Sequence, residues 1–210
     1  MFREVLRKVC AVELGHEVVG EADNGERAIE LICRVTPELV LLDLHLPGLD
    51  GFAVAEEIRR RAPLVKILVL SSHCDEYAVF RAEQLRVQGF VDKNTNSVET
   101  LKQAIRAVAE GRPWFSELFQ RAKAARRRDP LSFDKILTER ERAILVLIGV
   151  PLSDAEIAQE IGIAEDTAAK HRFNLLRKLE LQTTTELVRY AREHGFTLPG
   201  RPGSGPESLP

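Results

Sequence analysis

The chain has 210 residues, which is enough for one large domain or two small ones. Hydrophobic residues make up 44% of it, charged residues 30%, and the net charge is −2, so any surface that attracts nucleic acid must be local. No run of about 18 apolar residues occurs, the N-terminus lacks a signal-peptide pattern, and three widely separated cysteines favour reduced thiols. These features predict a cytoplasmic protein that does not enter a membrane.

Residues 2–110 alternate between helix-like and strand-like patterns. Apolar residues at helical spacing predict helices near residues 2–12, 24–32, 52–58, 77–85 and 98–108. Apolar runs predict strands at Glu17–Ala22, Leu39–Asp43, Lys66–Ser71 and Gly89–Asp92. This alternation favours an α/β domain over residues 1–110, in which helices cover a parallel sheet.

A composition change follows this domain. Gly111 and Pro113 break the last helix, and we predict a linker over residues 111–132, with a basic cluster at Arg126–Arg128 that solvation alone would explain. Residues 133–198 are helical throughout, with predicted helices near 143–148, 154–161, 164–179 and 184–194. Two Ser/Thr-x-x-Glu capping boxes precede the first two of them. Residues 199–210, rich in Pro and Gly, are predicted to be disordered.

Three polar residues follow successive strand-like runs of the first domain. Asp43 ends one run, Ser71 the next, and Lys93 comes directly after the last. Because the carboxyl ends of parallel strands meet at one edge of a sheet, these side chains should lie near one another. A carboxylate can take a phosphoryl group as a nucleophile, and a lysine and a hydroxyl can neutralise its oxygens. The three residues therefore predict a phosphoryl site.

The second domain contains a helix-turn-helix pattern, with residues 154–161, a turn at Gly162 and Ile163, and residues 164–179. The outward face of the second helix carries basic and amide side chains suited to the major groove, where Lys and Arg bind guanine or phosphate and Asn binds adenine. A helical hairpin that serves only as an interaction module remains the alternative. The charges of the two helices nearly balance, which predicts a modest salt dependence of DNA binding.

Residues 2–110 resemble a CheY-like (flavodoxin-like) receiver domain of a two-component response regulator. The motifs that carry the resemblance are VLLDLHLPGLDG at residues 40–51, LVLSS at 68–72 and GFVDK at 89–93. The resemblance implies that Asp43 is the phosphoacceptor and that Ser71, Phe90 and Lys93 respond to the phosphoryl group. It also implies that Asp43 and the backbone carbonyl of His45 bind Mg²⁺.

The resemblance has one departure. Receivers of this kind begin with a strand that ends in an acidic pair, whereas this sequence starts with a helix-like pattern at Phe2–Val12. Without that pair, Asp43 would hold Mg²⁺ weakly, and loss of a central strand should open a gap or force the strands to pair differently. Two explanations are open: a receiver truncated at its N-terminus, for example by a start codon assigned too far downstream, or a natural degenerate receiver. We favour the first.

Residues 133–197 resemble the LuxR/FixJ-type DNA-binding domain. The motifs are LTERE at 137–141, DAEIA at 154–158, IGI at 161–163, TAAKHR at 167–172 and LRKL at 176–179. The resemblance implies phosphate contacts from Thr167 and Lys178, and base or backbone contacts from Ala169, Lys170 and Phe173. The remaining candidate contacts, on or beside the same outward face, are His171, Asn174 and Arg177. Ala169 and Phe173 depart from the more common polar or basic residues of the family, and residues 184–194 resemble its dimer helix.

These resemblances together identify a response regulator of the NarL/FixJ type, a transcription factor rather than an enzyme. The implied partners are double-stranded DNA, a sensor histidine kinase that phosphorylates Asp43, and a second copy of the chain on DNA. Two alternatives are a regulator that binds DNA independently of phosphorylation, and a phosphatase with an aspartate nucleophile. Such a phosphatase needs a second carboxylate two residues on, where this chain has His45.

Overall fold

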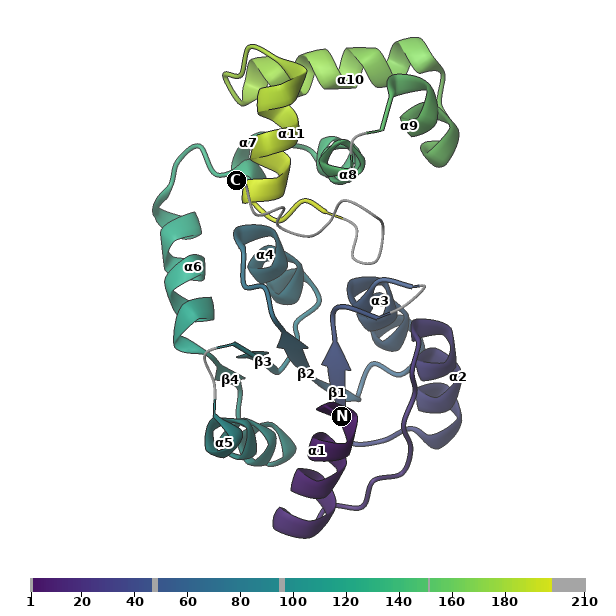
Figure 1. Ribbon diagram of the computed structural model, residues 1–210, viewed down its shortest axis with the longest axis vertical. Helices are drawn as coiled ribbons and strands as arrows, with labels where there is room; N and C mark the ends of the chain where they lie inside the picture. The colour runs from purple at the N-terminus through teal and green to yellow at the C-terminus, as the bar shows by residue number, and fades with distance from the viewer. Residues whose placement is uncertain (1, 47–48, 95–96, 151, 198–210) are drawn as a thin grey trace, which may run out of the picture. The chain divides into compact units, whose positions relative to one another are not determined.

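The computed structural model describes residues 2–46, 49–94, 97–150 and 152–197 (Figure 1). The chain divides into two compact units. The first comprises Met1–Cys74 and Arg81–Arg121, and the second comprises Asp75–Phe80 and Ala122–Pro210. The helix α6, Glu117–Arg128, occupies much of the predicted linker. The predicted disordered tail, residues 199–210, lies outside the described residues.

From residue 25 to residue 109 the first unit alternates helices and strands in the order that the sequence predicts. Its helices are α1 (Phe2–Lys8), α2 (Gly25–Val35), α3 (Gly51–Arg61) and α5 (Val98–Ala109), and a π-helical turn (Val9–Glu13) extends α1. Its strands are β1 (Leu39–Asp43), β2 (Lys66–Ser71), β3 (Gly89–Asp92) and β4 (Trp114–Phe115). The helix α4 (Glu76–Gln84) has residues in both units.

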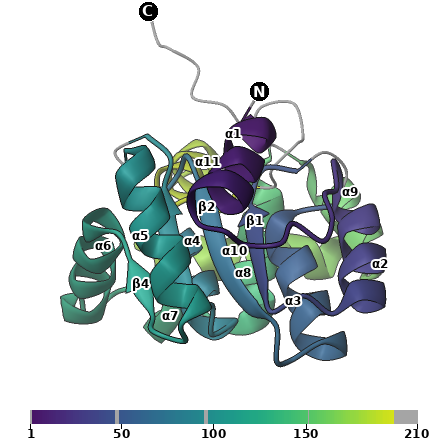
Figure 2. The same ribbon diagram turned by 90° about the horizontal axis from the view of Figure 1, so that it is seen from below.

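The four strands form one parallel sheet in the order β1-β2-β3-β4, which confirms the predicted α/β domain. Every residue of β3 and all of β2 beyond Lys66 are buried. Alternate side chains of a strand face opposite sides, and Leu68 and Leu70 pack with Val9 and with apolar residues of α5 on one face. The ribbon shows α1 and α5 on that side of the sheet (Figure 2). Ile67 and Val69, also fully buried, therefore point to the other face.

The predicted strand at Glu17–Ala22 is wrong, because the structure has no strand there. Among the strands of the described residues β1 lies at the edge of the sheet, but the 17–22 segment does not pair with its open side, and Val18 and Val19 are exposed. An isolated extended segment gains no inter-strand hydrogen bonds and stays irregular. β4 was not predicted, because two residues after Pro113 are too short to show a pattern.

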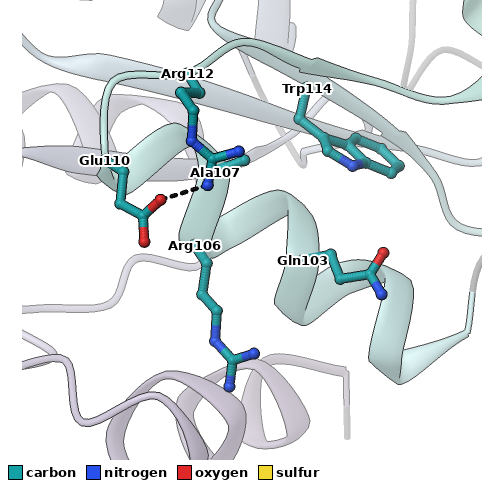
Figure 3. A pocket seen from close by; sticks show the side chains of 6 residues that line it. All are labelled: Gln103, Arg106, Ala107, Glu110, Arg112 and Trp114. Carbon is teal, nitrogen blue, oxygen red and sulfur yellow. Dashed lines mark hydrogen bonds and ion pairs between the residues drawn. The ribbon is translucent and has the colours of Figure 1, made fainter.

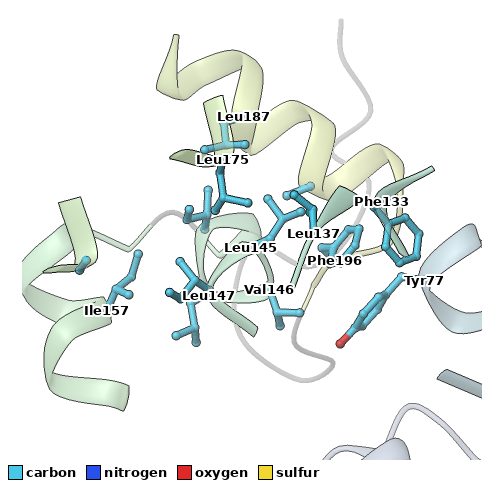
Figure 4. Packing of buried hydrophobic residues seen from close by; sticks show 14 of the residues in the cluster. Tyr77, Phe133, Leu137, Leu145, Val146, Leu147, Ile157, Leu175, Leu187 and Phe196 are labelled. Carbon is cyan, nitrogen blue, oxygen red and sulfur yellow. The ribbon is translucent and has the colours of Figure 1, made fainter. Parts of the chain in front are cut away.

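The second unit is helical. It contains α7 (Phe133–Ile136), α8 (Glu139–Gly149), α9 (Asp154–Ile161), α10 (Glu165–Lys178) and α11 (Thr184–Glu193). The last four agree with the predicted helices, and α7 was not predicted. Its core is built around Leu145 of α8, Leu175 of α10 and Leu187 of α11, all fully buried (Figure 4). At one end Tyr77 and Phe133 pack on Phe196, with ring centroids 4.4 and 4.7 Å from it.

Gly51, the first residue of α3, lies against the carboxyl end of β1. A Cβ atom there would come within 2.5 Å of the carbonyl oxygen of Asp43 and of the Cα of Leu44, which are backbone atoms that cannot rotate away. Gly51→Ala should therefore displace this end of the strand and destabilise the first unit by about 1–3 kcal/mol. Urea unfolding followed by Trp114 fluorescence measures the loss, and the exposed Arg60→Ala on the same helix serves as the control. An unchanged midpoint for Gly51→Ala would contradict the expectation.

Candidate functional site

The predicted phosphoryl site forms at the carboxyl edge of the sheet. The Nζ of Lys93 donates to Oδ2 of Asp43 at 2.5 Å, across 50 residues of sequence. The backbone N–H of Lys93 donates to the carbonyl of Ser71 at 2.8 Å. The structure thus brings the carboxylate and the ammonium into direct contact and fixes both beside the end of β2. The carboxylate remains accessible, since 30% of the Asp43 side chain is exposed.

The other two residues assigned to the phosphoryl response are buried. The hydroxyl of Ser71 accepts a hydrogen bond from the backbone N–H of His73 at 3.1 Å and is closed off from solvent. Phe90 lies in β3 with no exposed surface, and its ring centroid is 5.1 Å from that of Phe119 in α6. Within the described residues no hydrogen bond or ring contact joins either side chain to Asp43, so their role stays a prediction.

Two histidines flank this site, and the sequence analysis used only the backbone of one. The rings of His45 and His73 lie 4.9 Å apart, each two residues beyond a strand-end residue. Burial and the neighbouring His73 lower the pKa of His45, Lys93 acts in the same direction, and Asp43 opposes them. The imidazole of His45 is therefore neutral near pH 7, and Lys93 is the cation in contact with Asp43. The regular spacing after Asp43 and Ser71 is the signal that would have found His73.

The Mg²⁺ implied by the resemblance does not fit the side chains at this edge. Oδ1 of Asp43 accepts from the backbone N–H of His45 at 3.0 Å, and Oδ2 accepts from Lys93. In the part of the chain that the structure describes, no group of three or more His, Cys, Asp or Glu residues could hold a metal ion. Mg²⁺ requires near-octahedral oxygen ligands, and this set supplies one carboxylate already held by a lysine.

A second recess lies between α5 and β4 of the first unit (Figure 3). It has a volume of about 330 Å³ and is lined by Gln103, Arg106, Ala107, Glu110, Arg112 and Trp114. Glu110 is hydrogen-bonded to Arg112, which lowers the pKa of its carboxyl. The recess shares no residue with the predicted sites and has no nucleophile or metal-binding set.

The helix-turn-helix is built as the sequence predicts. The α9 helix begins with the capping box of Ser153 and Glu156 and ends at Gly162, whose φ of 66° suits a residue without a side chain. Arg172 of α10 then ties the two helices together, since its Nε donates to Asp154 at 2.7 Å and its Nη2 to the carbonyl of Leu152 at 3.0 Å. The inner face of α10 buries Ala168 and Leu175.

The predicted DNA-contacting residues fall into two groups on α10. The exposed ones are Thr167, Ala169, Lys170, Phe173 and Arg177, and the half-buried ones are His171, Asn174 and Lys178. Lys178 differs from the other cations, because its Nζ donates to Oε2 of Glu141 at 2.8 Å and to the carbonyl of Ile136 at 3.2 Å. The structure therefore gives Lys178 a packing role that the sequence analysis missed, and its phosphate contact stays a prediction.

Glu141 is the buried partner in this pair. Its carboxylate also accepts from the backbone N–H and hydroxyl of Thr138, which completes the capping box of α8. Burial opposes ionisation of Glu141, but the hydrogen bonds from Lys178 and Thr138 outweigh it and hold the pKa below its usual value. The ionised carboxylate thus joins the start of α8 to the end of α10.

Comparison with known proteins gives the family. The model of the response regulator receiver domain matches residues 1–106, and that of the luxR family of bacterial regulatory proteins matches residues 135–191. The response regulator protein VraR of Staphylococcus aureus is 34% identical over 180 residues, which cover 86% of each chain. The chain therefore belongs to the response regulators that join a receiver domain to a LuxR-type DNA-binding domain.

Solved structures of response regulators are similar to this chain. The two-component response regulator of the LuxR family from an Aurantimonas species is 30% identical, with a TM-score of 0.56, over 60% of this chain and 90% of that one. RcsB of Salmonella enterica, solved on promoter DNA with a phosphomimetic, is 22% identical and shares the fold, with a TM-score of 0.62 over 90% of this chain and 91% of that one.

The family settles the class of protein. This chain is a DNA-binding transcription regulator of a two-component system and not an enzyme, so the phosphatase alternative is wrong. In addition, none of the described helices has the length and apolar character needed to cross a membrane.

The pair of Glu141 and Lys178 predicts a pH-dependent stability of the second unit. The pKa of Glu141 is lower in the folded chain than in the unfolded chain. Its ionised carboxylate therefore contributes fully to the free energy of unfolding above the pKa of the unfolded chain, and this contribution is lost as the pH falls through the pKa of the folded chain. Glu141→Gln should lower the free energy of unfolding by about 1–2 kcal/mol at pH 7 and by less at pH 4. Urea unfolding followed by helical circular dichroism measures both.

Glu156→Gln is the matched control, because Glu156 closes the same kind of capping box on α9 but is exposed and has no ion pair in the described residues. Glu156→Gln should lower the free energy of unfolding at pH 7 by less than Glu141→Gln does. Equal losses for the two variants would show that the lysine contact contributes nothing.

Proposed function

We propose that Asp43 accepts a phosphoryl group from a sensor histidine kinase and that this modification controls DNA binding. The observation that carries the proposal is the contact of the accessible Asp43 carboxylate with Lys93 at the carboxyl edge of the sheet. The carboxylate oxygen forms a bond to phosphorus as the bond from phosphorus to the donor nitrogen breaks, and that nitrogen takes a proton. The product is an acyl phosphate.

Lys93 has a defined task in this proposal. Before transfer its ammonium neutralises Asp43, and after transfer the same ammonium stabilises the charge of the phosphoryl oxygens. It lies close enough to do both without moving its backbone, which stays bonded to the carbonyl of Ser71. Ser71 would exchange its local bond from His73 for a phosphoryl oxygen, and Phe90 would follow. A shift between two states in this way requires only a few kcal/mol of differential stabilisation.

We also propose that the described part of the receiver has no counterpart of the first strand and acidic pair of the family pattern. Two observations support this: β1 is the edge strand of the sheet in the described residues, with Leu39–Leu41 half-buried, and no metal-binding set is present there. Mg²⁺ would then bind Asp43 and the carbonyl of His45 weakly or not at all. Intact-mass analysis of the protein from its native host tests the N-terminus directly.

In the second unit, we propose that α10 enters the major groove of double-stranded DNA. The exposed Lys170 and Arg177 are separated by about two turns of the helix and would reach phosphates or guanine edges, and Thr167 would contact a phosphate near the N-terminus.

Structures of RcsB include a DNA complex and two dimers bound to two parallel DNAs. By analogy we propose that this chain binds as a homodimer through α11, placing two α10 helices about one DNA turn apart.

The second candidate is regulation without phosphorylation. It is favoured by the absence, among the described side chains, of a metal-binding set beside Asp43, since phosphoryl transfer gains much of its charge neutralisation from a metal. In this case Lys93 would simply keep Asp43 neutralised, and a protein partner or the amount of protein would set the occupancy of DNA.

The two candidates are separated by a phosphorylation experiment on the full chain. Incubation with acetyl phosphate, with Mg²⁺ or with EDTA, should yield a phosphoprotein in the wild type and none in Asp43→Asn, because the proposed acceptor is the accessible carboxylate that lies against Lys93. Intact mass spectrometry, which detects a gain of one phosphoryl group, measures the yield. The exposed Asp23→Asn is the matched control and should behave as the wild type.

DNA affinity is measured on the same samples. A gain or loss of affinity on phosphorylation, absent in Asp43→Asn, supports control by the phosphoryl group. If the wild type takes no phosphoryl group and binds DNA equally with and without the donor, regulation without phosphorylation replaces control by the phosphoryl group.

A further inference from the structure

The outward face of α10 exposes a phenyl ring. Phe173 is 65% exposed, and among the exposed large hydrophobic residues of the described chain it is the single aromatic one. The other large apolar side chains of α10, Leu175 and Leu176, pack in the core of the second unit or against it. The helix therefore has a complete inner face, and Phe173 contributes nothing to it.

The neighbours of Phe173 indicate what covers it. Residues three and four positions away are adjacent on a helix, so Lys170 precedes Phe173 and Arg177 follows it on the same face. Both cations are exposed, and neither has an ion pair among the described residues. Ala169, also adjacent, is too small to shield the ring. A phenyl ring between two uncompensated cations suits a polyanion that carries an apolar group, and suits an apolar protein surface poorly.

We propose that Phe173 recognises the 5-methyl group of a thymine in the major groove. This inference rests on the proposed entry of α10 into that groove. The ring has no hydrogen-bond donor or acceptor and cannot pair with the polar edges of guanine, adenine or cytosine. The thymine methyl is the one apolar group that the major-groove edges of the bases present. Lys170 and Arg177 would bind phosphates on either side and so place the ring without reading sequence themselves.

The experiment removes the methyl group and nothing else. DNA sites are first selected with the full-length chain, and each thymine of the selected site is then replaced by deoxyuridine. At one thymine position in each half-site the wild type should lose about four-fold in affinity, as expected for one buried methyl group. Phe173→Ala should bind more weakly overall and lose nothing further at that position. Phe173→Leu should keep part of the discrimination.

Arg177→Ala is the matched control on the same face. It should reduce the slope of log affinity against log salt by about one unit and keep the full sensitivity to deoxyuridine. Phe173→Ala should leave that salt slope unchanged, because it removes no charge. Helical circular dichroism confirms that both variants remain folded.

Two results would overturn the inference: equal wild-type affinity for thymine and deoxyuridine at every position, or equal sensitivity to deoxyuridine in Phe173→Ala and the wild type. A change in the solution mass of the free protein in Phe173→Ala, with no deoxyuridine effect, would assign the ring to a protein contact instead. If the wild type selects no sequence at all, it is the proposed entry of α10 into the groove that fails.

Discussion

The interpretation of the sheet edge as a phosphoryl site depends on the contact between Asp43 and Lys93. It exists because β1 and β3 run parallel with β2 between them, so that their carboxyl ends reach the same edge of the sheet. An unpaired carboxylate there would repel a phosphoryl donor. With the ammonium at 2.5 Å the local charge is close to neutral, and an incoming anion meets a cation that is already in place. The buried strands β2 and β3 keep that geometry fixed.

The charged groups around Asp43 bear on the requirement for a metal. In a receiver with an acidic pair, three carboxylates need a divalent cation. Here one carboxylate faces one ammonium, with the neutral His45 beside it and no larger set of acidic or histidine side chains in the described residues. Lys93 thus already compensates the charge of Asp43, and this is the feature that makes the comparison of Mg²⁺ with EDTA in the phosphorylation test informative.

The sequence predicted the central strands, the helices of the second unit and the pairing of Asp43 with Lys93, because each rests on a local pattern or on the rule that parallel strands end together. The strand at 17–22 was wrong because a β-like run becomes a strand only when a neighbour supplies hydrogen bonds. The contact between Glu141 and Lys178 was missed for a related reason. It joins residues 37 positions apart on different helices, and no periodicity encodes such a distance.

The ion pairs of Lys93 with Asp43 and of Lys178 with Glu141 differ in their surroundings, and the difference separates a candidate switch from a structural pair. Glu141 is 7% exposed and accepts from both Thr138 and Lys178, so drawing the lysine away to another anion would leave a buried negative charge uncompensated. Asp43 is 30% exposed, and solvent can replace any bond it loses. Opening the ion pair of Glu141 and Lys178 therefore costs more free energy than opening the ion pair of Asp43 and Lys93 at the edge of the sheet. This difference in exposure is the physical reason to look for regulation at Asp43 and for rigidity at Glu141.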